Sequence, residues 1–393
     1  MKILIITGLH PKVNDPMSGI FITRRVKKLQ EKGIDLDLIA FNYEDSFWLQ
    51  VVKKLLKKPL PHQIKQVEDE DVKYKFLPIN LGVFDRFNYY KKLGKLGFKT
   101  LKDNLQLSNY DLVHAHWVYP HGFIATIIKT EFGIPCVVSA HGSDIHTNPF
   151  QIPKTKPYVV YTLNNADKLI FNNSKLLETS MQLGYEGGHH KVIPNGVDTS
   201  LFYPIEKESI RERLKLPDLK SKYVGFVGNL KWVKRAEILP KIFKRIADQY
   251  GDVRFVVVGD GELRFDIEKE CSTYNLKIVF KGRLHPSLIP DWMNALDVLI
   301  LPSRREGFPN VVLEAQACGC PVVGTNVGGI PEAIGDGGIV VDEGEDFEGR
   351  FASAVIKILE SPISQEILRN RAEKYDWDKI IFQQIKVYKE LTR

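Results

Sequence analysis

Two series of short, nearly continuous apolar runs, rich in valine and isoleucine, constrain the fold of this 393-residue chain more than any other feature. Polar stretches with helical spacing separate the runs. In the first half the runs are residues 2–7, 35–41, 111–117, 136–141, 168–173 and 191–196. In the second half they are residues 223–228, 253–261, 277–282, 298–303, 321–326 and 337–342. Such runs are typical of parallel strands covered on both faces. We therefore predict an α/β protein with two doubly wound, Rossmann-like domains.

The domain boundary is predicted in the proline-containing stretch IPNGVDTSLFYPIEK, because its turn residues separate the two series. We assign residues 1–200 to an N-terminal domain and residues 201–375 to a C-terminal domain. Residues 376–393 have helical apolar spacing over much of their length. We expect them to form a C-terminal helix that crosses back to the N-terminal domain.

The sequence favours a cytoplasmic protein. Its apolar amino-terminal stretch is short and lacks a cleavage site of small residues, and no run is long enough to span a bilayer. The four cysteines are scattered, which is typical of a reducing compartment. They are Cys136, Cys271, Cys318 and Cys320.

The formal net charge of +7 is concentrated in residues 51–100, where 12 Lys/Arg face 5 Asp/Glu. Residues 46–60, SFWLQVVKKLLKKPL, would place apolar side chains on one helical face and lysines on the other. Residues 86–102 add aromatics and lysines, although Gly94 and Gly97 weaken a helix there. One interpretation is binding to an anionic membrane surface, and the other is a helix packed on its own domain with solvated lysines. No nucleic-acid motif accompanies the charge, so nucleic acid is not expected as a partner.

The stretch SRREGFPNVVLEAQACGCP follows a predicted buried strand and starts a predicted helix at Pro309. Ligands of parallel sheets bind at the carboxyl ends of the strands, and the amino end of a helix favours an anion such as a diphosphate. Glu306 and Glu314 would flank that anion and accept hydrogen bonds from sugar and ribose hydroxyls. The stretch therefore suggests a nucleotide-sugar site, although two exposed acids would give the same spacing.

The longer stretch PSRREGFPNVVLEAQACGCPVVGTNVGGIPEAI resembles the donor-site signature of the retaining glycosyltransferases of family 4. The blocks DLVHAHW, VVSAHGSD, IPNGVDTSLF and VGNLKWVKR resemble that family's other blocks in the expected order. The resemblance implies a GT-B fold, in which two Rossmann-like domains face a cleft. Residues 1–200 would bind the acceptor, and residues 201–375 would bind the nucleotide-sugar. It covers most of the chain.

The resemblance also implies roles for individual residues. Glu306 would contact hydroxyls of the donor sugar and Glu314 the ribose, with Gly307 and Pro309 in the same loop. The backbone amides of Phe308 and Asn310 would hold the distal phosphate or the sugar. Lys234 stands at a position that grips the diphosphate. Glu306, His141 and Lys234 are the predicted catalytic residues.

Asn229 departs from the family pattern, because an arginine usually stands at its position. The departure removes one cation from a site that must stabilise a leaving diphosphate. Lys231 or Arg235 is expected to compensate, and Arg235 itself replaces a usual glycine.

The resemblance also implies donor contacts outside this loop. His141 would be a polar contact near sugar and phosphate and not a base. Gly19 matches a glycine loop after the first strand, where the family has two adjacent glycines and this chain has Ser18–Gly19. Gly282 and Arg283 fall where the base is usually held.

Metal binding is not expected. Cys318 and Cys320 offer too few ligands for zinc, and the family block accounts for His114 and His116 without a metal. Asp69–Asp71 superficially fits a metal-binding D-x-D motif, but a solvated charge run explains it better. His121 and His146 were weighed with the other histidines and give no ligand set.

The resemblance implies a metal-independent, retaining glycosyltransferase of the hexosyltransferase type that needs no cofactor. The expected donor is UDP- or GDP-linked, and the expected acceptor is a glycan, lipid-linked, in the synthesis of cell-envelope polysaccharide. Two alternatives remain open: a catalytically silent module that binds nucleotide-sugar, or an epimerase or phosphorylase of the GT-B fold. An oxidoreductase is disfavoured because no G-x-G-x-x-G follows a strand.

Overall fold

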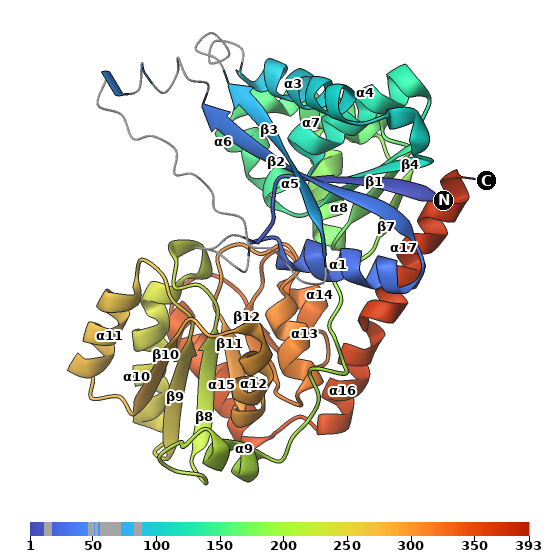
Figure 1. The fold of residues 1–393 in the computed structure, drawn as a ribbon. Helices are drawn as coiled ribbons and strands as arrows, with labels where there is room; N and C mark the ends of the chain where they lie inside the picture. Colours follow the sequence, from blue (N-terminus) through green and yellow to red (C-terminus); the bar gives the residue numbers. More distant parts are fainter. Residues whose placement is uncertain (12–17, 46–50, 52–53, 56–71, 82–88, 393) are drawn as a thin grey trace. The chain divides into compact units, whose positions relative to one another are not determined.

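A computed structural model describes residues 1–11, 18–45, 51, 54–55, 72–81 and 89–392. Contacts divide the chain into two compact units (Figure 1): unit 1 is Met1–Ile193 with Ile380–Arg393, and unit 2 is Pro194–Lys379. The chain passes from unit 2 into unit 1 within its last helix, α17 (Trp377–Leu391). Each unit is described here by itself.

Unit 1 is built on a seven-stranded parallel sheet in the order β3-β2-β1-β4-β5-β6-β7. The strands are β1 (Lys2–Thr7), β2 (Asp35–Asp45), β3 (Tyr74–Leu81), β4 (Leu112–His116), β5 (Cys136–Ala140), β6 (Lys168–Phe171) and β7 (His190–Val192). The helices include α1 (Ile20–Glu31), α3 (Tyr89–Asn104), α4 (Phe123–Phe132), α5 (Ser143–His146), α6 (Asn148–Gln151), α7 (Lys156–Asn165) and α8 (Ser174–Leu183). Figure 1 shows α1 and α17 on one face of this sheet and α3, α4 and α7 on the other.

Unit 2 is built on a six-stranded parallel sheet in the order β10-β9-β8-β11-β12-β13. The strands are β8 (Lys222–Val227), β9 (Val253–Val258), β10 (Ile278–Gly282), β11 (Val298–Leu301), β12 (Val322–Thr325) and β13 (Gly338–Val341). The helices include α9 (Lys207–Arg213), α10 (Leu239–Gln249), α11 (Arg264–Thr273), α12 (Ile289–Ala295), α13 (Asn310–Ala317), α14 (Ile330–Ile334), α15 (Phe347–Glu360) and α16 (Gln365–Lys374).

Successive side chains along the strands of unit 2 belong alternately to two separate hydrophobic cores. Val256 and Leu299 belong to the cluster under α12 and α13, whereas their neighbours Val257 and Ile300 belong to the cluster under α10 and α15. Successive side chains of a strand point to opposite faces, so a sheet covered on both faces needs apolar residues at every position. This explains the continuous apolar runs of the sequence. The prediction of two doubly wound, Rossmann-like sheets is confirmed.

The sequence analysis missed one strand, β3. It lies at the edge of its sheet and pairs only with β2 among the described residues. Phe76 and Pro78 are less buried than Leu77 and Ile79 between and beyond them, so the segment lacks a continuous apolar run. An edge strand also tolerates a proline, because its amide is not needed for the ladder.

The two glycines of α3 have a packing role. A Cβ on Gly94 would lie 2.3 Å from a ring carbon of Phe123, and one on Gly97 would lie 2.4 Å from a methyl carbon of Ile124. Glycine at both positions lets α3 approach α4 closely, with Leu93 and Leu101 buried in the same core. The helix therefore forms despite the low helix propensity of glycine.

Candidate active site

The loops that follow the strands of unit 2 touch one another through glycines at the carboxyl edge of the sheet. A Cβ on Gly259, after β9, would lie 1.9 Å from the carbonyl oxygen of Gly228, after β8. A Cβ on Gly328, after β12, would lie 1.9 Å from the carbonyl oxygen of Glu306, after β11. Both glycines have positive φ, which favours glycine in any case. The loops can meet this closely only because these positions carry no side chain.

Lys234 and Glu306, two of the predicted catalytic residues, form an ion pair at this edge. Lys234 ends the short 3₁₀ turn Trp232–Lys234 after β8, and Glu306 lies in the loop between β11 and α13. The Oγ of buried Ser303 also donates to the Glu306 Oε1, at 2.9 Å. The Glu306 side chain is 11% exposed and that of Lys234 is 25% exposed. The carboxylate is thus fixed from two sides and still reaches the surface.

Arg304 ties the lysine turn to the glutamate loop, and the sequence analysis missed it. Its backbone amide donates to the carbonyl of Val233 at 3.0 Å, and its guanidinium donates to the carbonyl of Trp232 at 2.8 Å. The guanidinium also pairs with Glu237 and lies 4.3 Å from the centre of the Trp232 ring. The only signal in the sequence was a basic residue two positions before Glu306.

Helix α13 begins at Asn310, directly after the Glu306 loop, and Pro309 is its N-cap. The sequence analysis placed Pro309 in the first turn, one position further in. Gly307 and buried Phe308 lie between Glu306 and the cap, and the Phe308 ring packs 5.6 Å from that of Tyr375. Glu314 lies about one turn inside the helix and is partly exposed. The positive end of the helix dipole is therefore next to Glu306.

The guanidinium of Arg235, expected as one possible replacement for the arginine absent at position 229, already has other partners. Its backbone has φ +53°, which explains why a glycine is the ordinary choice at this position. Its guanidinium pairs with Glu343 and lies 4.6 Å from the centre of the Phe347 ring. Asn229 and Lys231 are exposed, and the Lys231 amide donates to the Asn229 carbonyl at 2.9 Å. Lys231 is thus more exposed than Arg235, the other basic residue expected to compensate for Asn229.

Gly282 is the last residue of β10, and Arg283 follows it at the same edge of the sheet. Gly282 is buried with φ +63°, and its carbonyl accepts a hydrogen bond from the Gly259 amide at 2.7 Å. A Cβ on Gly282 would lie 3.0 Å from an Arg264 nitrogen, and Arg283 is exposed. The structure therefore brings the predicted donor contacts of unit 2 to one edge of one sheet.

Gly19 and His141, the predicted contacts in unit 1, both lie at loops that follow strands of its sheet. Gly19 caps α1 with φ +71°, and a Cβ there would lie 2.8 Å from the backbone carbon of Leu9. The ring of Phe21, in the first turn of α1, lies 5.0 Å from the ring of His141, after β5. The first turn of α1 and His141 therefore share one region of unit 1.

His141 is held by its ring and by its backbone. The His141 Nε2 lies 2.9 Å from the His116 Nδ1, and Asp144 accepts from the His141 amide at 3.1 Å. Burial, with smaller effects of Arg25 and His114, keeps the pKa of His141 well below its ordinary value. The ring is therefore neutral near pH 7, which suits a hydrogen-bonding contact.

The cysteines and histidines weighed as metal ligands have other partners. Both ring nitrogens of His114 are hydrogen-bonded, to Tyr388 and Ser139. Cys318 and Cys320 are buried against the carbonyls of Pro290 and Pro321. Within the described part of the chain, no three His, Cys, Asp or Glu side chains form a metal-binding group. Asp69–Asp71 lies outside the described residues.

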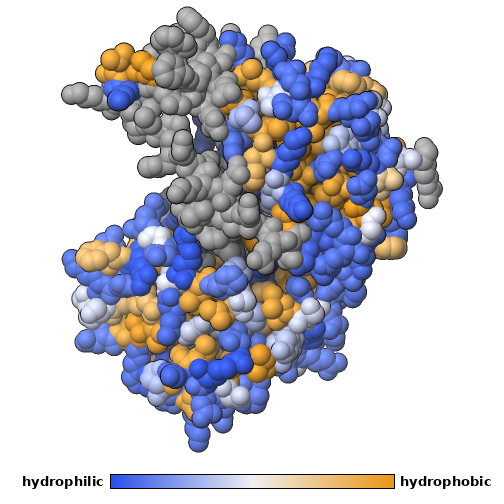
Figure 2. Space-filling view, viewed as in Figure 1, coloured by the Kyte–Doolittle hydropathy of each residue, from blue (hydrophilic) through white to orange (hydrophobic). Residues whose placement is uncertain are grey.

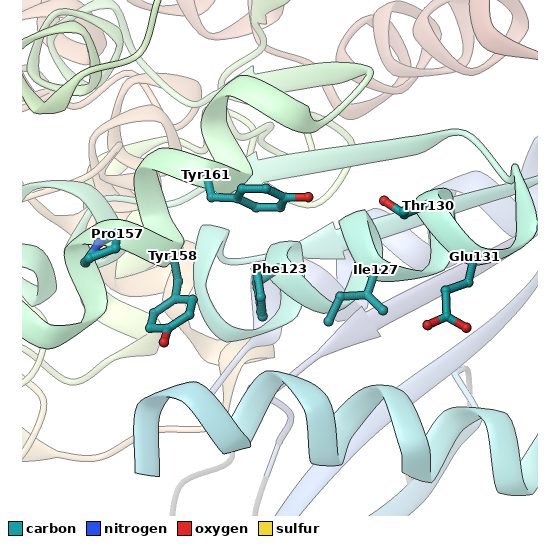
Figure 3. A pocket seen from close by; sticks show the side chains of 7 residues that line it. All are labelled: Phe123, Ile127, Thr130, Glu131, Pro157, Tyr158 and Tyr161. Carbon is teal, nitrogen blue, oxygen red and sulfur yellow. The ribbon is translucent and has the colours of Figure 1, made fainter. Parts of the chain in front are cut away.

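A groove on unit 1 involves none of the predicted site residues (Figure 3). It has a volume of about 430 Å³ and lies on α4 and α7. Its lining side chains are Phe123, Ile127, Thr130, Glu131, Pro157, Tyr158 and Tyr161. The lining is mostly apolar and aromatic.

Hydrophilic side chains cover most of the visible surface, with scattered apolar patches between them (Figure 2). No helix in the described ranges combines the length and the apolar character needed to cross a bilayer. Residues 46–60, predicted as a basic amphipathic helix, lie outside the described residues except for 51, 54 and 55.

The contact between Gly328 and Glu306 generates a stability prediction. Gly328→Ala combines left-handed backbone strain with a clash against the Glu306 carbonyl, and should lower the unfolding free energy of unit 2 by roughly 2–4 kcal/mol. Gly344→Ala is the control, since Gly344 also has positive φ but a Cβ there would lie 3.5 Å from a nitrogen of the flexible Arg350 side chain. Urea unfolding should show the larger loss for Gly328→Ala, and hydrogen exchange should rise in residues 303–310 of that variant alone. Equal losses with unchanged exchange would contradict the close approach.

Comparisons with known proteins identify the family. Residues 18–201 match the family model described as Glycosyltransferase Family 4, and residues 221–361 match the model described as Glycosyl transferases group 1. The chain is 29% identical, over 85% of its length and 83% of the relative's, to the putative teichuronic acid biosynthesis glycosyltransferase TuaC of Bacillus subtilis. It is 24% identical, over 100% of its length and 98% of the relative's, to N-acetyl-alpha-D-glucosaminyl L-malate synthase of Bacillus anthracis.

Solved structures with the same fold cover nearly the whole chain. Anabaena HepE in complex with UDP matches with a TM-score of 0.74 and 19% identity, over 99% of this chain and 100% of that one. Sucrose-phosphate synthase from Thermosynechococcus elongatus matches with a TM-score of 0.72 and 21% identity, over 100% and 99%. These matches show the GT-B fold. The two family models, which together match most of the chain, show that it belongs to glycosyltransferase family 4.

Proposed function

We propose that this glycosyltransferase moves a sugar, with retention and without a metal, from a UDP- or GDP-linked donor to a glycan acceptor. The proposal depends above all on the Lys234–Glu306 ion pair, which lies beside the amino end of α13 at the carboxyl edge of the sheet of unit 2. A cation, a fixed carboxylate and the positive end of a helix are the groups that a diphosphate joined to a sugar requires.

Each charged group of the site would contact a different part of the donor. A diphosphate next to Glu306 alone would be repelled, but Lys234 pairs with the carboxylate, is the more exposed of the two, and would be shared with the phosphates. The backbone at the amino end of α13 would add hydrogen bonds to the anion. Glu306, still held by Ser303, would then accept from sugar hydroxyls. Glu314 would accept from the ribose, and Gly282 and Arg283 would lie against the base.

Departure of the diphosphate is the step that needs charge stabilisation. Lys234 and the helix dipole of α13 would stabilise the developing charge without a metal. The acceptor hydroxyl would attack on the same face of the sugar, and the leaving phosphate would take its proton. His141, neutral because it is buried, would act as a hydrogen-bonding contact to sugar or phosphate and not as a base.

The relatives support the class of substrate. HepE has been solved with UDP and with UDP-glucose, and TuaC is named for teichuronic acid biosynthesis. We therefore favour a uridine nucleotide and an acceptor that belongs to a growing cell-envelope polysaccharide, carried on a lipid. A role on the inner face of the membrane would follow from such an acceptor.

One observation favours the second candidate, a silent nucleotide-sugar-binding module. Asn229 occupies the place of an arginine, and the guanidinium of Arg235 is already paired with Glu343. The site then offers Lys234 and exposed Lys231 as its nearby cations. Release of nucleoside diphosphate that depends on acceptor separates the two candidates, because a silent module would bind donor and release nothing.

Variants of the ion pair test the assigned roles. Lys234→Met should lower kcat by about a hundredfold or more, because the leaving diphosphate loses its cation. Glu306→Gln should lower turnover of the nucleotide-sugar while UDP itself binds as tightly as before or more tightly, because a negative charge near the phosphates is removed. Both are measured by the acceptor-dependent release of nucleoside diphosphate and by calorimetry.

Lys244→Met is the matched control, since Lys244 forms an exposed ion pair with Asp248 on α10. It should leave both measurements unchanged. Parent-like turnover of Lys234→Met would refute the proposed donor site.

The membrane proposal changes with the structure of α3. Gly94 and Gly97 pack its apolar side on α4, and among the side chains of α3 that the structure describes the exposed lysines are Lys95, Lys99 and Lys102. Such lysines attract an anionic surface by about 1 kcal/mol each near the lipid. We therefore propose an electrostatic contact for residues 86–102, with the apolar contact assigned to residues 46–60.

Lys95→Glu combined with Lys99→Glu should weaken cosedimentation with phosphatidylserine vesicles at low salt by at least tenfold. Lys269→Glu with Lys277→Glu makes the same charge change on unit 2, at exposed lysines, and should have a smaller effect. Equal binding of the parent to neutral and anionic vesicles, or no binding at all, would exclude the contact.

A further inference from the structure

Trp232 is an exposed aromatic residue beside the proposed donor site of unit 2. It is 52% exposed, and Val233 after it is 37% exposed. Within the part of the chain that the structure describes, the indole N–H of Trp232 has no hydrogen-bond partner. A tryptophan usually buries most of its large ring, and its N–H is usually paired when it does so. The side chain of Trp232 therefore leaves both an apolar ring and a hydrogen-bond donor open to solvent.

The backbone of Trp232 is held firmly although its ring is exposed. Its carbonyl accepts from the Arg235 amide at 2.9 Å and from the Arg304 guanidinium at 2.8 Å. The next carbonyl, that of Val233, accepts from the Arg304 amide at 3.0 Å. The Arg304 guanidinium, which pairs with Glu237, also lies over the indole ring, 4.3 Å from its centre. A ligand of this ring would therefore meet a side chain that needs little further ordering.

Two neighbouring cross-links join the turn after β8 to the loop after β11. Trp232 meets Arg304, and two residues further along both segments Lys234 meets Glu306. Because both segments advance by two residues, the indole ring belongs to the cross-link directly before the ion pair. A molecule that contacts Lys234 and Glu306 therefore has the exposed ring of Trp232 as its neighbour.

The nucleobase of the donor is not the expected partner of this ring. The proposed donor places its base at Gly282 and Arg283, at the end of β10, whereas the indole ring lies against Arg304, after β11. β9 and β8 lie between those two strands, and three strand spacings of about 4.8 Å add up to roughly 14 Å. In the same proposal Glu306 accepts from hydroxyls of the donor sugar. The ring of Trp232 is then left for the second substrate.

We propose that Trp232 is a stacking platform for a sugar ring of the acceptor glycan. The inference rests on the proposed function, which places the donor sugar at Glu306 and its leaving phosphate at Lys234. Transfer requires the acceptor hydroxyl to reach that sugar, so the acceptor ring must lie beside the same ion pair. A pyranose has an apolar face of C–H groups and a rim of hydroxyls, which match the ring and the N–H of an indole. Trp232 thus binds and positions the acceptor and takes no part in breaking the donor bond.

The experiment compares Trp232→Ala with Trp232→Phe in the full chain, loaded with UDP, or with GDP if only GDP binds. The probes are cellotetraose, maltotetraose, chitotetraose and a hyaluronan tetrasaccharide, titrated by calorimetry. We expect the parent to bind at least one of them, with an affinity that falls at least tenfold in Trp232→Ala. Trp232→Phe should keep most of the affinity, because a phenyl ring still offers a face. The same probe should change the tryptophan fluorescence of the parent and leave that of Trp232→Ala unchanged.

Tyr203→Ala is the matched control, since Tyr203 is another aromatic residue of unit 2 and is 49% exposed. The Tyr203 carbonyl accepts from Asn294 near the end of α12, the helix that leads into the amino end of β11. The control therefore removes an exposed ring at the edge of the sheet opposite the proposed site. It should leave the affinities for nucleotide and glycan unchanged.

Nucleotide affinity separates a glycan contact from mere support of the turn that carries Lys234. It should be close to the parent value in Trp232→Ala; a fall that matches the fall in glycan affinity would mean that the ring only supports the turn, and would overturn the proposal. Equal glycan affinity of the parent and Trp232→Ala, or no binding of any probe to the nucleotide-loaded parent, would also overturn it. If the parent binds neither UDP nor GDP, the donor site of the proposed function fails, and this inference fails with it.

Discussion

The parallel direction of every strand pair in both sheets is the constraint on which this structure depends. Parallel strands need a crossover after each strand, and all carboxyl ends of a sheet then lie at one edge. In unit 2 this edge collects Lys234, Gly282 and Glu306, which lie far apart in the sequence. In unit 1 it collects the end of β1, the start of α1 and His141. The predicted site residues of each unit therefore lie in the loops at the carboxyl edge of its sheet.

Close backbone contacts hold the loops in place at the carboxyl edge of the unit 2 sheet. Gly259 lies against Gly228 and Gly328 against Glu306 at distances that a Cβ would not allow. Arg304 adds a side-chain link from the Glu306 loop to the turn that carries Lys234. The Lys234–Glu306 ion pair therefore joins two loops that are also held by these other contacts. The positions of the two side chains do not depend on their mutual attraction alone.

Unit 1 places a neutral histidine beside a buried cation. Arg25 donates to Gln384, and a chain of neutral groups continues from there through Tyr388 to His114. The histidines at the ends of β4 and β5 remain uncharged as a result of their burial.

The strands of both cores could be predicted from the sequence, because a strand buried on both faces leaves an apolar run. β3 could not, since an edge strand with Pro78 leaves no such run. Lys234 and Glu306 came from the family resemblance and their pairing from the structure. Ser303 and Gly328 carry no local signal, and Arg304 carries only a basic charge near Glu306, because the roles of all three lie in contacts across loops. Arg25 and Gln384 are 359 residues apart in the sequence, and no pattern in one chain reveals such a bond.

The donor site in unit 2 is the central claim, and its most direct test is calorimetric titration of UDP, GDP and ADP into the parent protein and Glu314→Ala, in EDTA. The account predicts that one nucleotide binds the parent without metal, and that its affinity falls at least tenfold in the variant, because hydrogen bonds from the ribose hydroxyls to a charged group are lost. Binding that requires a divalent metal would contradict the metal-independent site. Failure of all three nucleotides to bind would contradict the donor site itself.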